Sequence, residues 1–325
     1  EMEGKPDWLP GFPVQIYCNR SDKVSGGGGS NGYSNISPRI QMMQSEQNAQ
    51  SSQQDIEINR FLEELLKEFN NRDTEAIQRH LNEIEKALGR EIDGIDSILF
   101  GGSISKKTFI EGISDVDALV FLNGSKYKLL TPKELQDKFV ALLKVRFPKT
   151  EISKGALAVT LKFSDYEIQL LPAIKDRNKI IIADRSGNTW SNPINVNAFT
   201  SKLTLVNKAN GNKVVPVIKL AKNLFSTLPK QYHISGYHIE ALAVEAFTNY
   251  NGRYAYYDMT KHLLSYSIKR VLAPIKDVTG QSDIIDDYLG PSKSVLRQHL
   301  SNHIKDLSSR FSGGDAVSII KELFT

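Results

Sequence analysis

Residues 99–122 read LFGGSISKKTFIEGISDVDALVFL. The stretch begins with an apolar run, turns at Gly101-Gly102-Ser103 and returns to an apolar run at residues 118–122. Short apolar runs bounded by glycine and serine are typical of strands joined by turns. We therefore predict a strand, a glycine turn, a short helix and a second strand, and the rest of the chain is expected to build on this unit.

Two acidic residues, Asp115 and Asp117, lie at the start of the second predicted strand. Side chains two residues apart in a strand point to the same face, so the two carboxylates are predicted to lie side by side. Neighbouring carboxylates repel each other unless a cation lies between them. Mg²⁺ prefers such oxygen ligands and combines one or two carboxylates with substrate phosphates. The pair therefore predicts a magnesium site.

The glycine turn has the features of an anion site. Gly101 and Gly102 carry no Cβ, so their backbone amides can approach an anion closely. The hydroxyl of Ser103 and the amides at the start of the next helix can hold phosphate oxygens. A tight turn, a helix cap and a solvated acidic pair would explain either half alone. Both halves at this spacing favour metal-dependent transfer of a nucleotidyl group.

The pattern GGS…SDVD in residues 101–117 resembles the signature of the DNA polymerase β-like nucleotidyltransferase superfamily. Two later segments, SGYHIEAL at 235–242 and DVTGQS at 277–282, resemble one branch, the cGAS/DncV-like nucleotidyltransferases (CD-NTases) of bacterial antiphage (CBASS) systems. This branch consists of oligonucleotide cyclases. The resemblance implies an α+β, bilobal polymerase β-like fold with a mixed β-sheet catalytic lobe, a helical brace and a helical C-terminal lobe.

Composition is compatible with an intracellular enzyme. The chain has 325 residues, a net charge of +4 and a single cysteine, Cys18. One cysteine excludes an intramolecular disulfide and a thiolate zinc cluster. No apolar run approaches the roughly 20 residues that span a bilayer, and no signal-peptide pattern is seen at the start. We expect a soluble, cytoplasmic protein with no membrane partner.

The chain divides into three parts by composition. Residues 1–54 are expected to lie outside the fold, as a disordered or engineered peptide joined by the Gly/Ser linker at 25–30. Residues 42–54 are rich in Gln and Ser and are predicted to be unstructured. Residues 55–195 are expected to form the catalytic lobe, which begins with a brace of two helices. Residues 196–325 are expected to form the helical nucleotide-binding lobe.

The apolar runs 157–163 and 166–171 predict a hairpin, and Pro172 is expected to end its second strand. The resemblance implies a third metal carboxylate three residues before this proline, where the chain has Gln169. Strand alternation places Glu167 on the same face. We predict Glu167 as the third ligand and Gln169 as its neighbour or a weak ligand. The open alternative is a solvated Glu167, with a site that uses two aspartates or is inactive.

The helical lobe is expected to contact the nucleotide. Lys219 and Lys222 project from one side of the helix predicted at 214–228. The resemblance places Lys222 on the triphosphate, whereas Lys219 is expected on a solvated basic edge. Ser235 suits the N-cap of the helix predicted at 237–250, and the resemblance implies that it contacts a phosphate.

Two further residues of this helix have expected structural roles. The resemblance makes Glu240 a structural anchor. His238 could be a polar lid residue, but a hydrogen-bonded structural histidine is the preferred interpretation. The aromatic residues that follow the helix are expected to serve packing more often than base stacking.

The resemblance implies a two-metal nucleotidyl transfer. The expected metal ligands are Asp115, Asp117 and Glu167. They would hold two Mg²⁺ ions, with Mn²⁺ as the substitute ion, while Gly102, Ser103 and Lys222 orient the β- and γ-phosphates. Two or more transfers would convert ATP and other NTPs into a cyclic di- or trinucleotide second messenger for antiphage defence. A downstream effector would bind the product, and the resemblance allows a HORMA-type activator.

Two other functions stay open at this point. The first is an RNA-tailing or tRNA-modifying nucleotidyltransferase, although the modest net charge argues against a nucleic-acid substrate. The second is a catalytically weak sensor that only binds nucleotide or RNA. The sensor is suggested by Gln169, which replaces the carboxylate implied by the resemblance.

Overall fold

The computed structural model describes residues 38–70, 74–91, 95–100, 106–110, 116–123, 127, 129–155, 157–176, 179–184, 186–195, 197–279, 283–313 and 316–324. The chain divides into two compact units, residues 1–47 and residues 48–325. The second unit holds every element below apart from the beginning of helix α1. Among the described residues, no helix combines the length and the apolar character that crossing a membrane requires.

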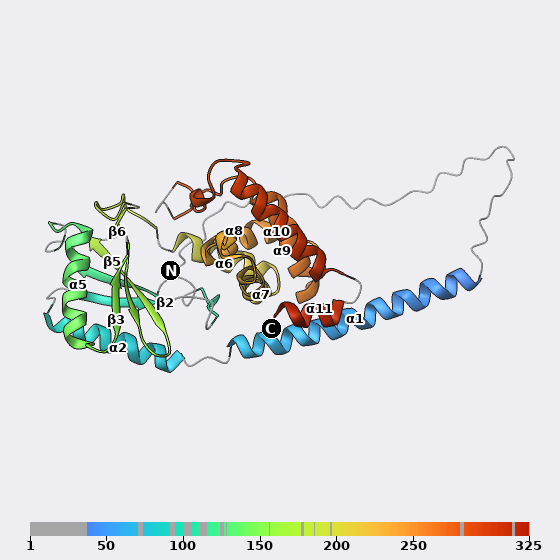
Figure 1. Ribbon diagram of the computed structural model, residues 1–325, viewed down its shortest axis with the longest axis horizontal. Helices are drawn as coiled ribbons and strands as arrows, with labels where there is room; N and C mark the ends of the chain where they lie inside the picture. The colour runs from blue at the N-terminus through green and yellow to red at the C-terminus, as the bar shows by residue number, and fades with distance from the viewer. Residues whose placement is uncertain are drawn as a thin grey trace, which may run out of the picture. The chain divides into compact units, whose positions relative to one another are not determined.

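The described strands form one six-stranded mixed sheet (Figure 1). Their order in the sheet is β1 (Ile95–Phe100), β2 (Val116–Asn123), β5 (Glu167–Asp176), β4 (Val159–Lys162) and β3 (Glu151–Lys154), with β6 (Lys179–Ile182) paired to β5. Strands β2 and β5 run parallel, and the other neighbours are antiparallel. The mixed sheet predicted from the sequence is therefore confirmed.

Strands β4 and β5 form the predicted hairpin, but its second strand is longer than expected. The prediction that Pro172 ends this strand is wrong, because β5 continues to Asp176. The β4 pairing stops at Leu170, and the β6 pairing starts at Ala173. Pro172 lies between these two antiparallel pairings, so its missing N–H interrupts neither of them.

Two amphipathic helices, α2 (Thr74–Glu91) and α5 (Pro132–Arg146), cover one face of the sheet (Figure 1). Helix α5 begins where predicted, because Thr131 and Glu134 form a capping box. The buried residues of the two helices recur at helical spacing and pack on alternate residues of β2 and β5. The helix residues are Ile77, Leu81, Ile84, Leu88, Leu135, Phe139 and Leu143.

The alternation of β2 and β5 decides which residues face away from these helices. The buried strand residues that pack against α2 and α5 are Ala118, Val120, Leu122, Ile168 and Leu170. Asp117 and Gln169 alternate with them and are only partly buried. They therefore lie on the opposite face, which leaves polar side chains near the beginning of two parallel strands.

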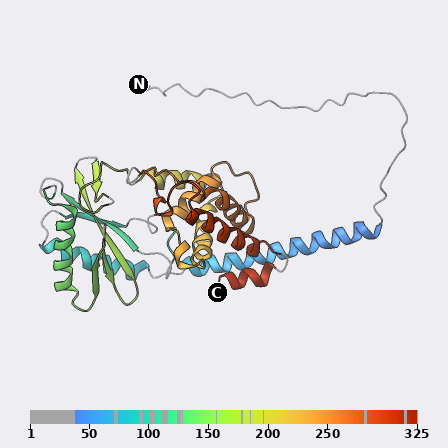
Figure 2. The same ribbon diagram turned by 45° about the horizontal axis from the view of Figure 1, so that its top comes forward.

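The helical lobe contains six helices among the described residues and has a hydrophobic core of its own. Figure 2 shows these helices gathered together. The helices are α6 (Ala198–Ala209), α7 (Val214–Ser226), α8 (Gly236–Phe247), α9 (Tyr256–Arg270), α10 (Val295–Phe311) and α11 (Ala316–Leu323). Short 3₁₀ turns, Lys230–Tyr232 and Asp287–Leu289, lie between them. Helices α7 and α8 are buried along most of their length, as their apolar sequences predict.

Helix α1 (Pro38–Asn70) corrects two predictions about the beginning of the fold. Residues 42–54 are helical rather than unstructured, because Gln, Glu, Met and Ala favour helix and no Gly or Pro interrupts residues 39–70. The brace is also divided. Buried residues of α1, such as Leu62, belong to the helical core, whereas α2 belongs to the sheet core. Residues 1–37, with the Gly/Ser linker, lie outside the described residues.

Candidate active site

Asp117 and Gln169 are direct neighbours in the sheet, because the parallel register of β2 and β5 pairs them. Glu167 is the first residue of β5 and is only partly buried, whereas Ile168 after it is fully buried. Alternation therefore places Glu167 on the same face as Gln169. The structure brings together three of the predicted site residues on the face opposite α2 and α5.

Strand β4 extends this polar strip. Thr160 is the cross-strand partner of Gln169, and Lys162 is the partner of Glu167. The ammonium of Lys162 is exposed and lies 3.5 Å from a carboxylate oxygen of Glu151. Glu167 therefore has a cationic neighbour across the strands, and its side chain can point either to the surface or to a metal.

Three predicted site residues, Gly102, Ser103 and Asp115, lie outside the described residues, and their roles stay predictions. Within the described part of the chain, no three His, Cys, Asp or Glu side chains form a metal-binding group. The predicted metal set includes Asp115, so this search does not test it. The described donors are the carboxylates of Asp117 and Glu167 and the amide oxygen of Gln169. Such oxygen donors fit Mg²⁺.

A buried ionic centre, formed by Lys106, Thr108, Lys222 and Glu240, lies where the two cores meet. The Lys222 ammonium lies 2.9 Å from Glu240 Oε1, 3.1 Å from the Thr108 carbonyl oxygen and 3.2 Å from Thr108 Oγ1. The Thr108 hydroxyl donates to Glu240 Oε1, and the Lys106 ammonium pairs with Glu240 Oε2. Helices α7 and α8 thus hold the segment 106–110, which precedes β2.

The ionic centre is almost closed to solvent, with side-chain exposures of 3% for Lys222 and 1% for Glu240. Burial favours a higher pKa for Glu240, but Lys222 and Lys106 outweigh it and keep the pKa below its ordinary value. Burial lowers the pKa of Lys222, and the charge of Glu240 opposes this shift. Asp117 also raises the pKa of Lys222, so the polar face of the sheet and the ionic centre share one electrostatic environment.

The beginning of α8 shapes the position of Lys222. The Ser235 hydroxyl accepts from the His238 N–H at 3.1 Å, which confirms the predicted N-cap. A Cβ at Gly236 would lie 3.2 Å from both Cε and Nζ of Lys222, so only a glycine leaves the lysine its present room. The end of the Lys222 side chain therefore lies close to Gly236, the residue after Ser235. The phosphate role of Ser235 stays a prediction.

Lys219 does not form the expected solvated basic edge. Its side chain is buried, with 2% exposure, and its ammonium donates to Asn70 Oδ1 at 2.5 Å. The prediction is wrong because α7 is packed inside the helical core, so even its lysines are enclosed. Lys219 holds the last residue of α1, whereas Lys222, three residues later, reaches the ionic centre.

The sequence reasoning missed Lys106 and Thr108. Both follow the glycine turn closely, and a lysine beside a predicted phosphate site is a signal that could have identified Lys106. Glu240 is a buried carboxylate within a largely apolar helix. Such a residue requires a buried cation as a partner, but the sequence does not tell which of many lysines provides it.

Tyr237 connects α8 to the loop after α9. Its hydroxyl donates to Asp277 Oδ1 at 2.9 Å, and the N–H and hydroxyl of Thr279 donate to the same oxygen at 2.8 and 2.7 Å. Burial, together with Asp277, raises the pKa of Tyr237, so the phenol stays protonated. The ring of Phe199 packs edge-on against Tyr237 with centroids 4.7 Å apart. Residues 280–282 of the predicted polar loop lie outside the described residues.

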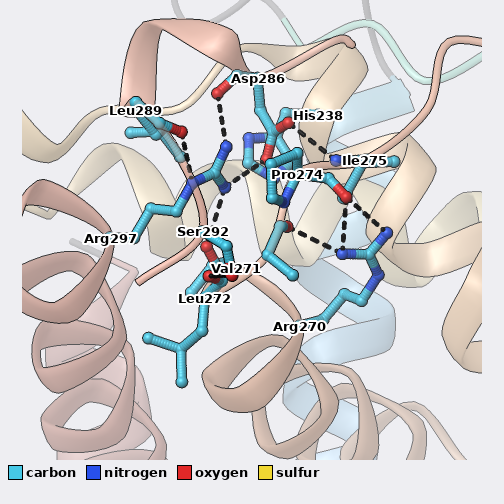
Figure 3. A network of polar contacts seen from close by, with 12 residues as sticks. His238, Arg270, Val271, Leu272, Pro274, Ile275, Asp286, Leu289, Ser292 and Arg297 are labelled. Carbon is cyan, nitrogen blue, oxygen red and sulfur yellow. Dashed lines mark hydrogen bonds and ion pairs between the residues drawn. The ribbon is translucent and has the colours of Figure 1, made fainter. Parts of the chain in front are cut away.

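A second buried carboxylate, Asp286, anchors the segment between α9 and α10 (Figure 3). Its Oδ2 lies 2.7 Å from Nη1 of Arg297, and its Oδ1 accepts from the Ile275 N–H at 2.9 Å. Arg297 also donates to the carbonyls of Val271 and Gly290, both at 2.9 Å. Side-chain and backbone acceptors thus surround the guanidinium.

His238 is fully buried beside this pair, as Figure 3 shows. Its Nδ1 lies 3.1 Å from the Tyr288 hydroxyl, and its Nε2 lies 3.6 Å from Asp286 Oδ2. Burial lowers the pKa of His238 to about 4, and Arg297 acts in the same direction. His238 is therefore a neutral, hydrogen-bonded structural residue, which confirms the preferred interpretation of the sequence.

Comparisons with known proteins agree with this arrangement. Residues 53–207 match the SMODS family model, described as "Second Messenger Oligonucleotide or Dinucleotide Synthetase domain". No curated protein sequence matches the chain.

Several solved structures share the fold at low sequence identity. CdnC of E. coli MS115-1 with ATP has a TM-score of 0.59 and 15% identity, over 81% of this chain and 92% of that chain. The CdnC:HORMA-deltaN complex has a TM-score of 0.57 and 15% identity, over 80% and 90%. Vibrio cholerae DncV, a cyclic AMP-GMP synthase, has a TM-score of 0.54 and 12% identity, over 86% and 90%.

The structural likeness concerns the fold, and the family match concerns the sequence of residues 53–207, which include Lys106, Asp117 and Gln169. Together they confirm the bilobal nucleotidyltransferase fold and the resemblance to CD-NTases that the sequence motifs implied. Residues 53–207 therefore match the SMODS synthetase domain, and the chain has the fold of the CD-NTases.

Proposed function

We propose that this protein makes a cyclic di- or trinucleotide second messenger from ATP and other NTPs in antiphage defence. The observation that carries the proposal is the position of Asp117. It lies on the polar face of the sheet beside Gln169 and interacts electrostatically with the buried ammonium of Lys222. A carboxylate for metal next to a cation for phosphate is the arrangement that nucleotidyl transfer requires.

Asp117 and Glu167, together with Asp115, are the residues that would hold two Mg²⁺ ions, and Gln169 adds a neutral oxygen ligand. The same oxygen ligands would accept Mn²⁺. When bound, the ions would supply a lowered pKa for the attacking hydroxyl and charge neutralisation for the leaving group.

The remaining residues bind and orient the nucleotide. Lys222, whose donors are used by Thr108 and Glu240, acts on the β- and γ-phosphates through its positive charge, while Gly102 and Ser103 donate to phosphate oxygens from the glycine turn. Ser235, at the exposed beginning of α8, donates to a further phosphate oxygen. A ribose hydroxyl oxygen then bonds to the α-phosphorus, the bond to the bridging oxygen breaks, pyrophosphate leaves and the hydroxyl proton passes to solvent. A further transfer within the linear product closes the ring.

The partners follow from the same proposal. ATP and other NTPs are the substrates, which agrees with the ATP bound by CdnC. A HORMA-type protein is the proposed activator, because CdnC forms a complex with one. A separate effector protein would bind the cyclic product.

The test is mass spectrometry of products from an NTP mixture incubated with the full chain and Mg²⁺, with and without a HORMA-type activator. We expect an acid-stable cyclic oligonucleotide. Asp117→Asn should lower its formation about 1,000-fold, or about 4 kcal/mol of transition-state stabilisation. Asp165→Asn is the matched control, because this exposed aspartate pairs with His80 of α2, a helix on the other face of the sheet, and should leave turnover unchanged. An extended or modified RNA as the product would contradict the proposal.

A second candidate function, nucleotide sensing, is favoured by one observation. Gln169 lies opposite Asp117, where a third carboxylate would complete the metal site. Tight NTP binding without turnover, in the presence of the activator, would support the sensor. Glu167→Ala and Gln169→Ala then decide the third ligand, because loss of turnover in only one of them identifies it.

A further inference from the structure

Lys106 makes contacts that the predicted mechanism does not use. Its ammonium pairs with Glu240 Oε2 and lies 5.3 Å from the ring centroid of Phe199 and 5.2 Å from that of Tyr237. The side chain is only 10% exposed. Three elements distant in the sequence, the segment 106–110, α6 and α8, therefore fix the position of this ammonium.

The two lysines of the ionic centre differ in how their donors are used. Lys222 has three acceptors, which are Glu240 Oε1 and both oxygens of Thr108. In the described part of the chain, Lys106 has one acceptor, the other carboxylate oxygen of Glu240. An ammonium has three donors, so Lys106 has the capacity to bind a ligand oxygen as well.

The charges of the centre also differ from those of an ordinary ion pair. One carboxylate, Glu240, contacts two ammonium groups that are both largely buried. A buried positive charge in excess of its partners is costly, unless an anion shares the site. Asp117 contributes a further negative charge to Lys222, whereas Glu240 is the described carboxylate that pairs with Lys106, so an anionic ligand would be stabilised next to Lys106.

The position of Lys106 in the chain indicates which anion this is. It follows Ser103 of the predicted phosphate turn by three residues. Glu240 contacts both Lys106 and Lys222, and it also accepts from the Thr108 hydroxyl. We infer that Lys106 is a second cation for the phosphate chain of the bound nucleoside triphosphate, positioned by Glu240 and by the rings of Phe199 and Tyr237. This inference rests on the proposed function.

The test compares Lys106→Met with Lys107→Met. The two variants remove the same charge from adjacent residues, but Lys107 is exposed and serves as the matched control. Lys222 remains as the partner of Glu240 in both variants, so both should fold. The measurement is calorimetric affinity for a non-hydrolysable ATP analogue and, separately, for adenosine.

We expect Lys106→Met to bind the triphosphate analogue at least tenfold more weakly, with unchanged adenosine affinity and an unchanged unfolding midpoint. Lys107→Met should bind both ligands like the wild type, and Lys106→Arg should retain most of the triphosphate affinity. In turnover assays, Lys106→Met should raise KM more than it lowers kcat.

Equal triphosphate affinity in Lys106→Met and the wild type would overturn the inference, and so would an equal loss of adenosine and triphosphate affinity with a lower unfolding midpoint. The second outcome would show that Lys106 only supports the fold. Failure of the wild type itself to bind the analogue would instead remove the proposed function, and this inference with it.

Discussion

Two buried carboxylates, Glu240 and Asp286, each hold a buried cation in the helical lobe, yet their surroundings differ. Asp286 pairs with one arginine, Arg297, and the other donors of that guanidinium reach backbone carbonyls of the same lobe (Figure 3). Glu240 is shared by two lysines, and one of them, Lys106, comes from the segment before β2.

The difference teaches that burial of charge does not by itself identify a functional site. The network around Asp286 is complete at Arg297, because its contacts join parts of one lobe and the guanidinium is surrounded by acceptors. Glu240 is instead shared by two lysines, and one of them, Lys222, also interacts with Asp117 on the sheet. Unequal pairing of charges, next to a polar strand end, is the feature that indicates a ligand.

The largest expected effect comes from breaking the complete network with Asp286→Asn. It leaves Arg297 buried without a counter-charge, which should lower the free energy of unfolding by about 3–5 kcal/mol. Urea unfolding measures it. Asp137→Asn is the control, because Asp137 is 59% exposed and its pair with Lys154 should contribute less than about 1 kcal/mol. A similar loss of unfolding free energy in both variants would contradict the expectation that the buried pair contributes more stability than the exposed pair.

The same network should make stability depend on pH. His238 has a pKa of about 4 in the folded protein against an ordinary value of 6.5, so the unfolded chain binds the proton first as the pH falls. Stability is therefore full above pH 6.5 and falls by up to about 3 kcal/mol towards pH 4. Asp286, whose pKa is held low by Arg297 despite burial, adds a loss of the same sign at lower pH. Unfolding midpoints across this range give the measurement.

The variant His238→Gln separates these two contributions. It removes the histidine titration, so the slope between pH 6.5 and pH 4 should become much flatter than in the wild type. An unchanged slope would show that another group causes the pH dependence.

The role of the ionic centre around Glu240 is tested by Lys222→Met, with Lys219→Met as the comparison. Both variants remove a buried lysine of α7. Lys222→Met should weaken binding of a triphosphate analogue by about 30-fold, or about 2 kcal/mol, because a positive charge near the phosphates is lost. Lys219→Met should lower only stability, since Lys219 donates to Asn70. If the two variants lose triphosphate affinity equally, the separation of their roles is wrong.

The smallest expected effect is that of Gly236→Ala. The new Cβ would lie 3.2 Å from the end of the Lys222 side chain and should displace the ammonium by a few tenths of an ångström. We expect about threefold weaker binding of the triphosphate analogue, which is less than 1 kcal/mol. Gly89→Ala in α2 meets no atom within 4 Å and should raise stability by about 0.5–1 kcal/mol without changing affinity.

Local patterns predicted much of the fold because they depend on nearest neighbours in the chain. The alternation around Asp117, the hairpin of β4 and β5, the capped start of α5 and the N-cap Ser235 were all visible as periodicity or turn chemistry. Two of the errors were also local, whereas the error about Lys219 came from tertiary packing. Pro172 was expected to end a strand, but it lies within β5. The Gln-rich segment was expected to be unstructured, but it is part of helix α1.

By itself, the sequence determined that this chain pairs an acidic strand with a glycine turn and adds a lysine-bearing apolar helix, which was sufficient to indicate a nucleotidyltransferase. Only the tertiary structure decided which lysine meets which carboxylate. Thr108 and Glu240 are 132 residues apart, and Thr108 and Lys222 are 114 apart. Contacts of this kind depend on how two cores pack together, and no periodicity along the chain encodes them.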